Sequence, residues 1–269
     1  MPFWRHIMEP FQIMKHTYNV ANDNNKVIGI TSRHGGISDY PEDSLNMALY
    51  IDDAPFNVHH NQALVANEIG FKTSDWVFPV QKHGNNIQEV FLEDKGTNVF
   101  ELTPKWLDVD GLYTNEKGIL LTMCFADCVP VYLYSVKDDF IALGHAGWRG
   151  TVGLIVDRLI KAYTGNIDDL KCIIGPSVTA PCYEVNDDIK RQFTELNLEL
   201  EDCFQINKNN MFDINLQEIN ARIAMNAGIK QENITITTRC TSTENREFFS
   251  YRLEKGKTGR MLAYIGTRD

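Results

Sequence analysis

Three apolar segments with strand character each carry a residue that can bind a metal, and this pattern constrains the fold more than any other sequence feature. The segments and their candidate ligands are Val77–Gly84 with His83, Leu120–Tyr134 with Cys128, and Ile141–Gly150 with His145. In the third segment, glycines surround Trp148 and Arg149, which leaves space beside a cation. Because the ligands are far apart in the sequence, a site forms only if the fold brings the three segments together.

Length and composition indicate one large globular domain. The chain has 269 residues, of which 43% are hydrophobic, so it can bury a substantial core. A formal net charge of −10 and the lack of a dense basic run argue against a nucleic-acid partner. No window approaches the roughly 18 apolar residues of a membrane span, and the N-terminus lacks the apolar core of a signal peptide. We therefore predict a cytoplasmic protein with no membrane partner, whose six cysteines are thiols.

Strand and helix signals alternate along the chain and predict an α/β (α+β) fold with mixed sheets and flanking helices. The predicted strands are Val27–Ser32, Trp76–Gln81, Ile87–Leu92, Gly118–Tyr134, Phe140–Gly144, Lys171–Ile174, Ile234–Arg239 and Met261–Ile265. The predicted helices are Asn57–Ile69, Asp187–Leu196, Leu216–Ala227 and a helix that follows Gly150. No shift in composition marks a linker, so we expect an irregular leader over residues 1–25 and one domain over residues 26–269.

The candidate ligands favour a catalytic metal over a structural one. His83, Cys128 and His145 lack the short paired spacing of a zinc finger, and each lies where regular structure is expected to break. Two imidazoles and one thiolate suit Zn²⁺ and leave a fourth position for water or substrate, where the metal lowers the pKa of the water to about 7. The alternatives are a hydrogen-bonded histidine, a packed cysteine, or a closed site that includes Cys124. A strand would separate Cys124 from Cys128 by about 13 Å, which disfavours the closed site.

Arginines and polar residues near glycine turns form a second group of candidates, suited to bind a phosphate or carboxylate. Within Thr31–Asn46, a strand ends at Ser32 and Arg33 and two glycines follow, so a ligand can approach the backbone closely. Near the C-terminus, the sequence FFSYR offers a further hydroxyl and guanidinium. The expected substrate- and phosphate-binding residues are Ser32, Asn46, Arg149, Ser250 and Arg252. Surface or structural ion pairs are the alternative role of the arginines.

A series of motifs resembles one family along nearly the whole chain. In order, the motifs are SRHGGIS, SLNMAL, QKHG, DGLYT, ADCVPV, HAGWRG, IGPSV, YEV and FFSYR. This set resembles the YfiH/DUF152 family from about Ser32 to about Gly266. The family is also called the laccase-domain or multicopper polyphenol oxidase family, and the YfiH-type purine nucleoside phosphorylases. One departure is Lys82, which stands where many relatives have valine and leaves the ligand His83 unchanged.

The resemblance implies a single-domain YfiH-like α/β/β/α layered fold and a His-Cys-His metal site at His83, Cys128 and His145. It implies phosphorolysis of adenosine, inosine, guanosine and methylthioadenosine to the base and a pentose 1-phosphate, and deamination of adenosine to inosine. Zinc is the expected cofactor, copper is the alternative, and purine nucleosides and phosphate are the expected partners. Copper-dependent phenol oxidation, editing of peptidoglycan precursors and a non-enzymatic zinc role are the alternative functions. The sequence does not indicate whether the chain forms an oligomer.

Residue types favour the nucleoside reactions over phenol oxidation. The seven histidines include no His-x-His pair, so the chain cannot bind the four coppers of a multicopper oxidase, although one copper ion suits a His₂Cys site. Deamination needs an acid that protonates the leaving ammonia, and Asp127 beside Cys128 is the first candidate if the strand breaks there. Phosphorolysis needs a phosphate held against the anomeric carbon, which arginines and backbone amides can do. The expected catalytic residues are Cys128, Asp127 and Arg33.

Overall fold

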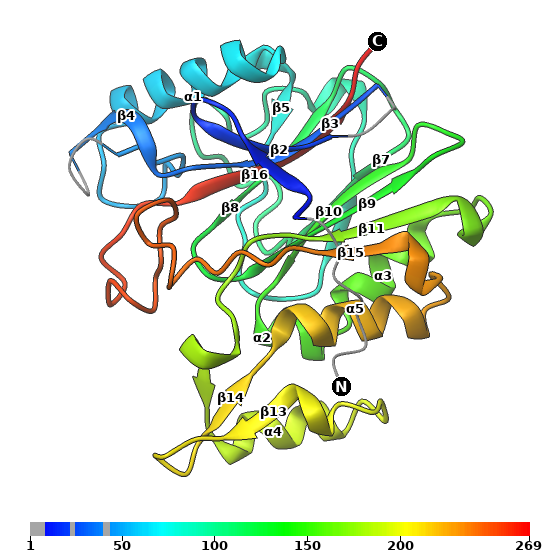
Figure 1. Cartoon of the computed structure of the whole chain (residues 1–269). Coiled ribbons are helices and arrows are strands. Elements are labelled where there is room, and N and C mark those ends of the chain that lie inside the picture. Colours follow the sequence, from blue (N-terminus) through cyan, green and yellow to red (C-terminus); the bar gives the residue numbers. More distant parts are fainter. Residues whose placement is uncertain (1–8, 22–24, 40–43) are drawn as a thin grey trace.

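The computed structural model describes residues 9–21, 25–39 and 44–269, which form a four-layered α/β/β/α fold (Figure 1). Two six-stranded sheets pack face to face in the middle. Helix α1 (Pro55–Ile69) covers the outer face of the first sheet. Helices α3 (Ile155–Ala162) and α5 (Leu216–Asn226) cover the outer face of the second. The predicted α/β fold with mixed sheets and flanking helices is confirmed.

The first sheet has the strand order β1-β2-β3-β16-β8-β5. Its strands are β1 (Phe11–Ile13), β2 (Thr17–Val20), β3 (Lys26–Thr31), β16 (Met261–Thr267), β8 (Leu120–Phe125) and β5 (Trp76–Val77). Neighbouring strands are antiparallel except β5 and β8, which pair in parallel at one edge. The short strand β4 (His34–Ser38) follows β3 and lies against α1.

Strands β1 and β2 correct the expectation that residues 1–25 form an irregular leader. Both strands belong to the first sheet, and the side chains of Phe11 and Tyr18 are almost fully buried. The strands are too short to show a periodic pattern, so only their tertiary partners stabilise them. The other parts of the expected leader include residues 1–8 and 22–24, which lie outside the described residues.

The second sheet has the strand order β15-β11-β9-β10-β7-β6. Its strands are β15 (Ile234–Ile236), β11 (Leu170–Ile174), β9 (Val129–Ser135), β10 (Ile141–Ala146), β7 (Gly111–Thr114) and β6 (Ile87–Glu89). The two edge pairs are parallel and the central pairs are antiparallel. A third, antiparallel sheet contains β12 (Glu184–Val185), β14 (Phe212–Ile214) and β13 (Phe204–Ile206), and it lies beside α4 (Asp187–Thr194) at the lower end of Figure 1.

The central core lies between the two large sheets. Its apolar side chains come from β3, β8 and β16 on one side and from β7, β9 and β10 on the other. Burial of such surface contributes roughly 25 cal/mol per Å² and is the main term that holds the layers together. A hydrogen bond also joins the two sheets, since the hydroxyl of Tyr132 in β9 donates to the carbonyl of Gly29 in β3 across 3.0 Å.

The helices agree with the sequence predictions except after Gly150. Helices α1, α4 and α5 lie where helices were predicted, and the Asn186 side chain caps α4 by accepting from the backbone N–H of Ile189. The single helix expected after Gly150 is instead two, α2 (Trp148–Val152) and α3. The chain breaks between them because Leu154 has a positive φ of 59°. The Asn85 side chain then donates to the freed carbonyl of Gly153 across 2.6 Å.

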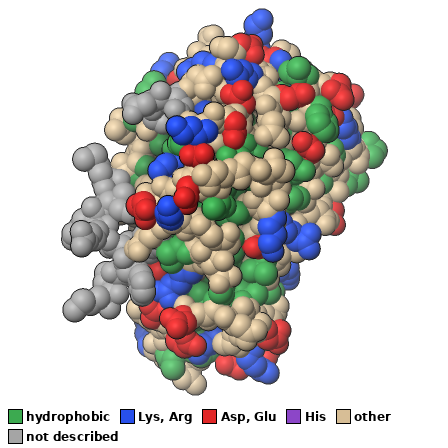
Figure 2. Space-filling model, turned by 90° about the vertical axis from the view of Figure 1, so that its right-hand side faces the viewer, with side chains coloured by type: hydrophobic (Ala, Val, Ile, Leu, Met, Phe, Trp, Pro, Cys, Tyr) green, Lys and Arg blue, Asp and Glu red, His purple; other side chains and the backbone are tan. Residues whose placement is uncertain are grey.

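Short 3₁₀ turns connect several elements. They are η1 (Thr73–Asp75), η2 (Leu92–Asp94), η3 (Ile167–Asp169), η4 (Ala180–Cys182), η5 (Glu201–Cys203) and η6 (Gln231–Asn233). Among the described helices, none has the length and apolar character that a membrane span requires. Figure 2 shows one face of the molecule, on which acidic and basic side chains are interspersed.

Candidate metal centre and its cavity

His83 lies in a turn that one buried carboxylate organises. The chain leaves the first sheet after β5 and reaches the sequence QKHG, in which His83 adopts a positive φ of 63°. The Asp110 carboxylate accepts hydrogen bonds from the backbone N–H groups of Lys82, His83 and Gly84, at 3.1, 3.0 and 2.8 Å. These bonds stabilise the left-handed conformation that an L-residue otherwise avoids.

His145 lies near the end of β10 and is bonded to the same carboxylate. Its Nδ1 lies 2.7 Å from Oδ1 of Asp110, and its backbone N–H donates to the Asp110 carbonyl across 2.8 Å. Asp110 directly precedes β7, the antiparallel neighbour of β10, so the register of the sheet places the two residues side by side. Because an ionised carboxylate only accepts, Nδ1 carries the proton and Nε2 is the atom left for a metal.

Cys128 lies where the chain crosses from one sheet to the other. The prediction of one continuous strand over Gly118–Tyr134 is wrong, because β8 ends at Phe125 in the first sheet and β9 begins at Val129 in the second. At the crossing, Asp127 has a positive φ of 83°. The break places the Cys128 thiol between the layers, close to both histidines.

The three predicted ligands converge. One ligand atom from each of His83, Cys128 and His145 lies within 4.8 Å of the others. The imidazole rings are 4.8 Å apart between centroids and meet edge to face at 75°. Gly147 leaves room beside them, since a Cβ atom there would lie 3.0 Å from the Cys128 sulfur and 3.4 Å from the His83 ring. Two imidazoles and one thiolate are the donor set of an open zinc site.

The electrostatics of the cluster favour a thiolate. Burial alone would raise the pKa of the Cys128 thiol, but His145 and His83 lower it to about 6. Burial alone would lower the pKa of His145, but the Cys128 sulfur and the Asp110 carboxylate raise it to about 9. Burial alone would raise the pKa of Asp110, but the hydrogen bonds from His145 and from the backbone have a larger effect. The pKa of Asp110 is therefore lowered.

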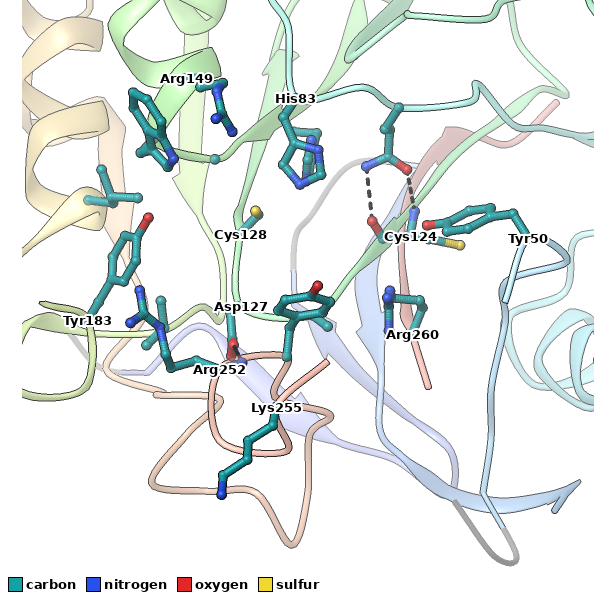
Figure 3. A pocket seen from close by; sticks show the side chains of 18 residues that line it. Tyr50, His83, Cys124, Asp127, Cys128, Arg149, Tyr183, Arg252, Lys255 and Arg260 are labelled. Carbon is teal, nitrogen blue, oxygen red and sulfur yellow. Dashed lines mark hydrogen bonds between the residues drawn. The ribbon is translucent and has the colours of Figure 1, made fainter. Parts of the chain in front are cut away.

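The cluster opens into a cavity of about 600 Å³, a size typical of small-molecule sites (Figure 3). Four aromatic side chains contribute to its wall: Tyr50, Trp148, Tyr183 and Tyr251. Four cationic side chains also line it: Arg149, Arg252, Lys255 and Arg260. Among the described residues, none of these four cations forms an ion pair with a carboxylate. The cavity of this acidic protein is therefore suited to bind anions.

Three of the predicted non-ligand residues line the cavity, namely Asp127, Arg149 and Arg252. The guanidinium of Arg149 lies 4.4 Å from the ring centroid of Trp148, and that of Arg252 lies 5.0 Å from the ring centroid of Tyr183. Both arginines thus have a fixed aromatic support and leave donors for a ligand.

Asp127 reaches the cavity wall, but its carboxylate is already engaged by the protein. Oδ1 accepts from the Thr241 hydroxyl at 2.6 Å. Oδ2 accepts from the Ser250 hydroxyl at 3.1 Å and from the backbone N–H of Arg252 at 2.6 Å. Asp127 therefore holds the loop that carries Arg252.

The other four predicted residues, Ser32, Arg33, Asn46 and Ser250, are not part of the cavity wall. Arg33 donates to Glu254 at 2.9 Å and to the carbonyls of Asn245 and Phe248, so it holds the base of the loop that carries Arg252. Ser32 accepts from the backbone N–H of His34. Asn46 accepts from the backbone N–H of Arg260 at 3.1 Å. Arg33, Asn46 and Ser250 therefore support segments that line the cavity.

Comparison with known proteins identifies the family of this chain. A sequence model of the family described as multi-copper polyphenol oxidoreductase laccase matches residues 27–268. The chain belongs to this family. The predicted resemblance to the YfiH/DUF152, or laccase-domain, proteins is thereby confirmed.

Relatives of this laccase-domain chain have been named and solved. A protein of Staphylococcus saprophyticus named purine nucleoside phosphorylase is 48% identical over 242 residues, which are 90% of this chain and 92% of the relative. Purine nucleoside phosphorylase YlmD of Staphylococcus aureus is 47% identical over 239 residues, 89% of this chain and 90% of the relative. The crystal structure of YlmD from Geobacillus stearothermophilus has a TM-score of 0.93 at 34% identity and covers 97% of this chain and 100% of its own. YfiH of Bacillus licheniformis also has a TM-score of 0.93 at 34% identity, with 96% and 99% covered.

Sequence reasoning missed several residues of this laccase-domain site. Asp110 is the most important, since it organises both histidines from a fully buried position. It begins the motif DGLYT, but an aspartate before a glycine is typical of a turn, so no local signal distinguished it. Arg260 and Tyr183 were also missed, because each joins the cavity through tertiary structure alone.

Proposed function

We propose that this chain is a metal-dependent purine nucleoside phosphorylase. The observation that carries the proposal is that the His83–Cys128–His145 cluster and four cations without carboxylate partners line one cavity. A metal, a phosphate and a flat base can therefore meet in one place. Relatives that cover most of the chain bear the name of this activity.

The donor set fits zinc. The lowered pKa of Cys128 favours the thiolate that a metal requires, and Asp110 holds His145 in the tautomer whose Nε2 is available. Zinc held by these residues would supply Lewis-acid chemistry to a bound purine or water. Copper is the alternative ion, because the same ligands bind it tightly.

The protein's own residues bind and orient the substrates. Arg149 and Arg252 hold orthophosphate in charge-assisted hydrogen bonds, with their guanidinium planes supported by Trp148 and Tyr183. The C1′–N9 bond of the nucleoside breaks, a phosphate oxygen bonds to C1′, and the departing base accepts a proton at nitrogen. The substrates in this proposal are adenosine, inosine, guanosine and methylthioadenosine.

Adenosine deamination to inosine is the second activity, because the metal cluster serves it without phosphate. Both carboxylate oxygens of Asp127 accept hydrogen bonds from neighbouring groups, which argues against its expected role as a proton shuttle. We propose instead that Asp127, together with Arg33 and Ser250, positions the loop that carries Arg252. Cys128 acts as a metal ligand in this proposal.

Phenol oxidation by several coppers has less support. In the described ranges 9–21, 25–39 and 44–269, a single group of three or more ligand side chains could hold a metal. A multicopper oxidase uses four copper ions in separate ligand sets, so the family's descriptive name does not fit this site.

Product analysis separates these activities. The zinc-loaded chain is incubated with adenosine, with and without phosphate, and adenine is resolved from inosine. Phosphorolysis predicts adenine and pentose 1-phosphate only with phosphate present, and deamination predicts inosine in both mixtures. The variant Arg149→Gln should raise the KM for phosphate at least tenfold, and the matched variant Arg158→Gln, on the exposed face of α3, should not. Absence of both products would contradict the proposal.

A further inference from the structure

The four cations of the cavity lie on different sides of the metal cluster. In Figure 3, Arg149, Tyr183 and Arg252 lie on one side of the Cys128 thiol, and Arg260 lies on the other side with Cys124 and Tyr50. One tetrahedral anion beside Arg149 and Arg252 therefore leaves Arg260 without a counter-charge.

Arg260 is held in place by contacts that leave donors free. Its Nη1 donates to the carbonyls of Thr258 at 2.7 Å and Gly259 at 2.9 Å. Its backbone N–H donates to Oδ1 of the fully buried Asn46. Among the described residues, no protein acceptor engages Nη2 or Nε, so one edge of a positioned guanidinium is available to a ligand.

No described anion compensates Arg260. Burial raises the pKa of the neighbouring Cys124 thiol to about 12, so this thiol is neutral. The Asp127 carboxylate is bonded to Thr241, Ser250 and the backbone of Arg252. Four arginines outside the cavity have carboxylate partners, in the pairs Arg33–Glu254, Arg191–Asp187, Arg222–Asp202 and Arg239–Glu244. Among the described residues, no carboxylate pairs with any of the three arginines that line the cavity.

We propose that the cavity has a second anion subsite at Arg260 and accepts nucleoside 5′-monophosphates. This proposal rests on the proposed phosphorylase function and names a further substrate class for the same site. Arg260 holds the 5′-phosphate, while Arg149 and Arg252 hold orthophosphate. The hydroxyl of Tyr50, which is hydrogen-bonded to the Cys124 thiol, lies on the same side as Arg260 and adds a neutral polar group there.

The reaction balances with the two substrates alone. The C1′–N9 bond of the nucleotide breaks with its electron pair on the base, and an oxygen of orthophosphate forms the new bond to C1′. The base takes up the proton that the phosphate loses. The products are a free purine and a pentose 1,5-bisphosphate, and nothing is oxidised or reduced.

Calorimetric titration of the zinc-loaded full chain, without phosphate, tests the subsite. Inosine 5′-monophosphate should bind at least tenfold more tightly than inosine, and neither ligand has an amino group that deamination could remove. The variant Arg260→Gln should weaken monophosphate binding at least tenfold and change inosine binding less than twofold, and the control Arg158→Gln should change neither. Equal affinities of the two ligands for the native chain would overturn the subsite, as would an equal loss for both in Arg260→Gln.

A competition experiment on the native chain does not depend on any variant folding. Sulfate serves as an unreactive tetrahedral anion at constant ionic strength. Two subsites predict that the chain saturated with the monophosphate still binds one sulfate ion at Arg149 and Arg252, whereas loss of sulfate binding in the saturated chain would show one shared anion site and refute the proposal.

The two proposals fail in different ways. A chain that releases adenine from adenosine but binds the monophosphate no more tightly refutes the second subsite alone. A chain that releases no base yet binds the monophosphate through Arg260 refutes the phosphorylase function and retains the subsite.

Discussion

The buried Asp110 carboxylate receives the Nδ1–H of His145 across 2.7 Å. The same carboxylate accepts three backbone N–H groups of the turn that carries His83. One side chain therefore fixes two of the three candidate ligands. Carboxylate–histidine–metal arrangements of this type orient the ring and raise its basicity.

Replacement of Asp110 with asparagine should weaken zinc binding by about 10–100-fold. The amide keeps one acceptor but directs an NH₂ group at N–H donors, so the turn at His83 and the ring of His145 lose their alignment. Competition with a chromophoric chelator measures the affinity. The control is Asp108→Asn, which removes an exposed carboxylate two residues away. Unchanged zinc affinity in Asp110→Asn would show that the carboxylate does not support the site.

Zinc binding to the metal-free chain should release one proton between about pH 7 and 8.5. In this range Cys128, whose pKa is about 6, is already a thiolate, and His145, whose pKa is about 9, is still protonated. Zinc must displace the His145 proton, so its affinity should rise about tenfold per pH unit and level off above pH 9. Titrations in two buffers of different ionisation enthalpy count the protons. A pH-independent affinity between pH 7 and 8.5 contradicts this assignment.

The variant Gly147→Ala should impair the metal site without unfolding the protein. Gly147 has a φ of −67°, which alanine adopts without strain, but the added methyl group would lie 3.0 Å from the Cys128 sulfur. We expect zinc affinity to fall at least tenfold while the free energy of unfolding of the metal-free chain changes by less than about 1 kcal/mol. The opposite pattern, an unstable chain with normal zinc affinity, would place the role of Gly147 in packing.

The variant Asp127→Asn distinguishes a positioning residue from a proton shuttle. Loss of the carboxylate leaves donors at Thr241, Ser250 and Arg252 partly unsatisfied, which costs about 2 kcal/mol of stability. Positioning predicts a raised KM and an unchanged pH profile of kcat, because the loop of Arg252 moves.

A second variant checks the same point while keeping the carboxylate. Thr241→Val removes one donor to Asp127, so a positioning role predicts a smaller rise in KM of the same kind. If Asp127→Asn instead removed one limb of the pH profile of kcat and Thr241→Val had no effect, Asp127 would be the shuttle.

The ligands were predictable from the sequence because their chemistry is local. His83, Cys128 and His145 each end or interrupt an apolar segment, and their residue types suit zinc. The residues alone left a hydrogen-bonded histidine or a packed cysteine as alternatives, and the family resemblance supplied the ligand set. The crossing at Asp127 was not predictable from periodicity, because β8 and β9 are buried on both faces and form one apolar run.

The supporting residues were not predictable for a different reason. Asp110 and Arg260 are positioned by hydrogen bonds to residues that are distant in the sequence. Such contacts cannot be derived from the local pattern of a single sequence. Conversely, Arg33 and Ser250 have residue types suited to binding anions, but the fold directs their hydrogen bonds to the protein.

Phosphate-dependent release of adenine from adenosine tests the central claim most directly. The rate is compared between the zinc-loaded native chain, Cys128→Ala, and the control Cys182→Ala, whose thiol lies outside the cavity wall. If the chain is a metal-dependent phosphorylase, the rate of Cys128→Ala should be at least 100-fold lower than that of the native chain, and the rate of Cys182→Ala should be unchanged. Equal rates in the native chain and Cys128→Ala would contradict the account.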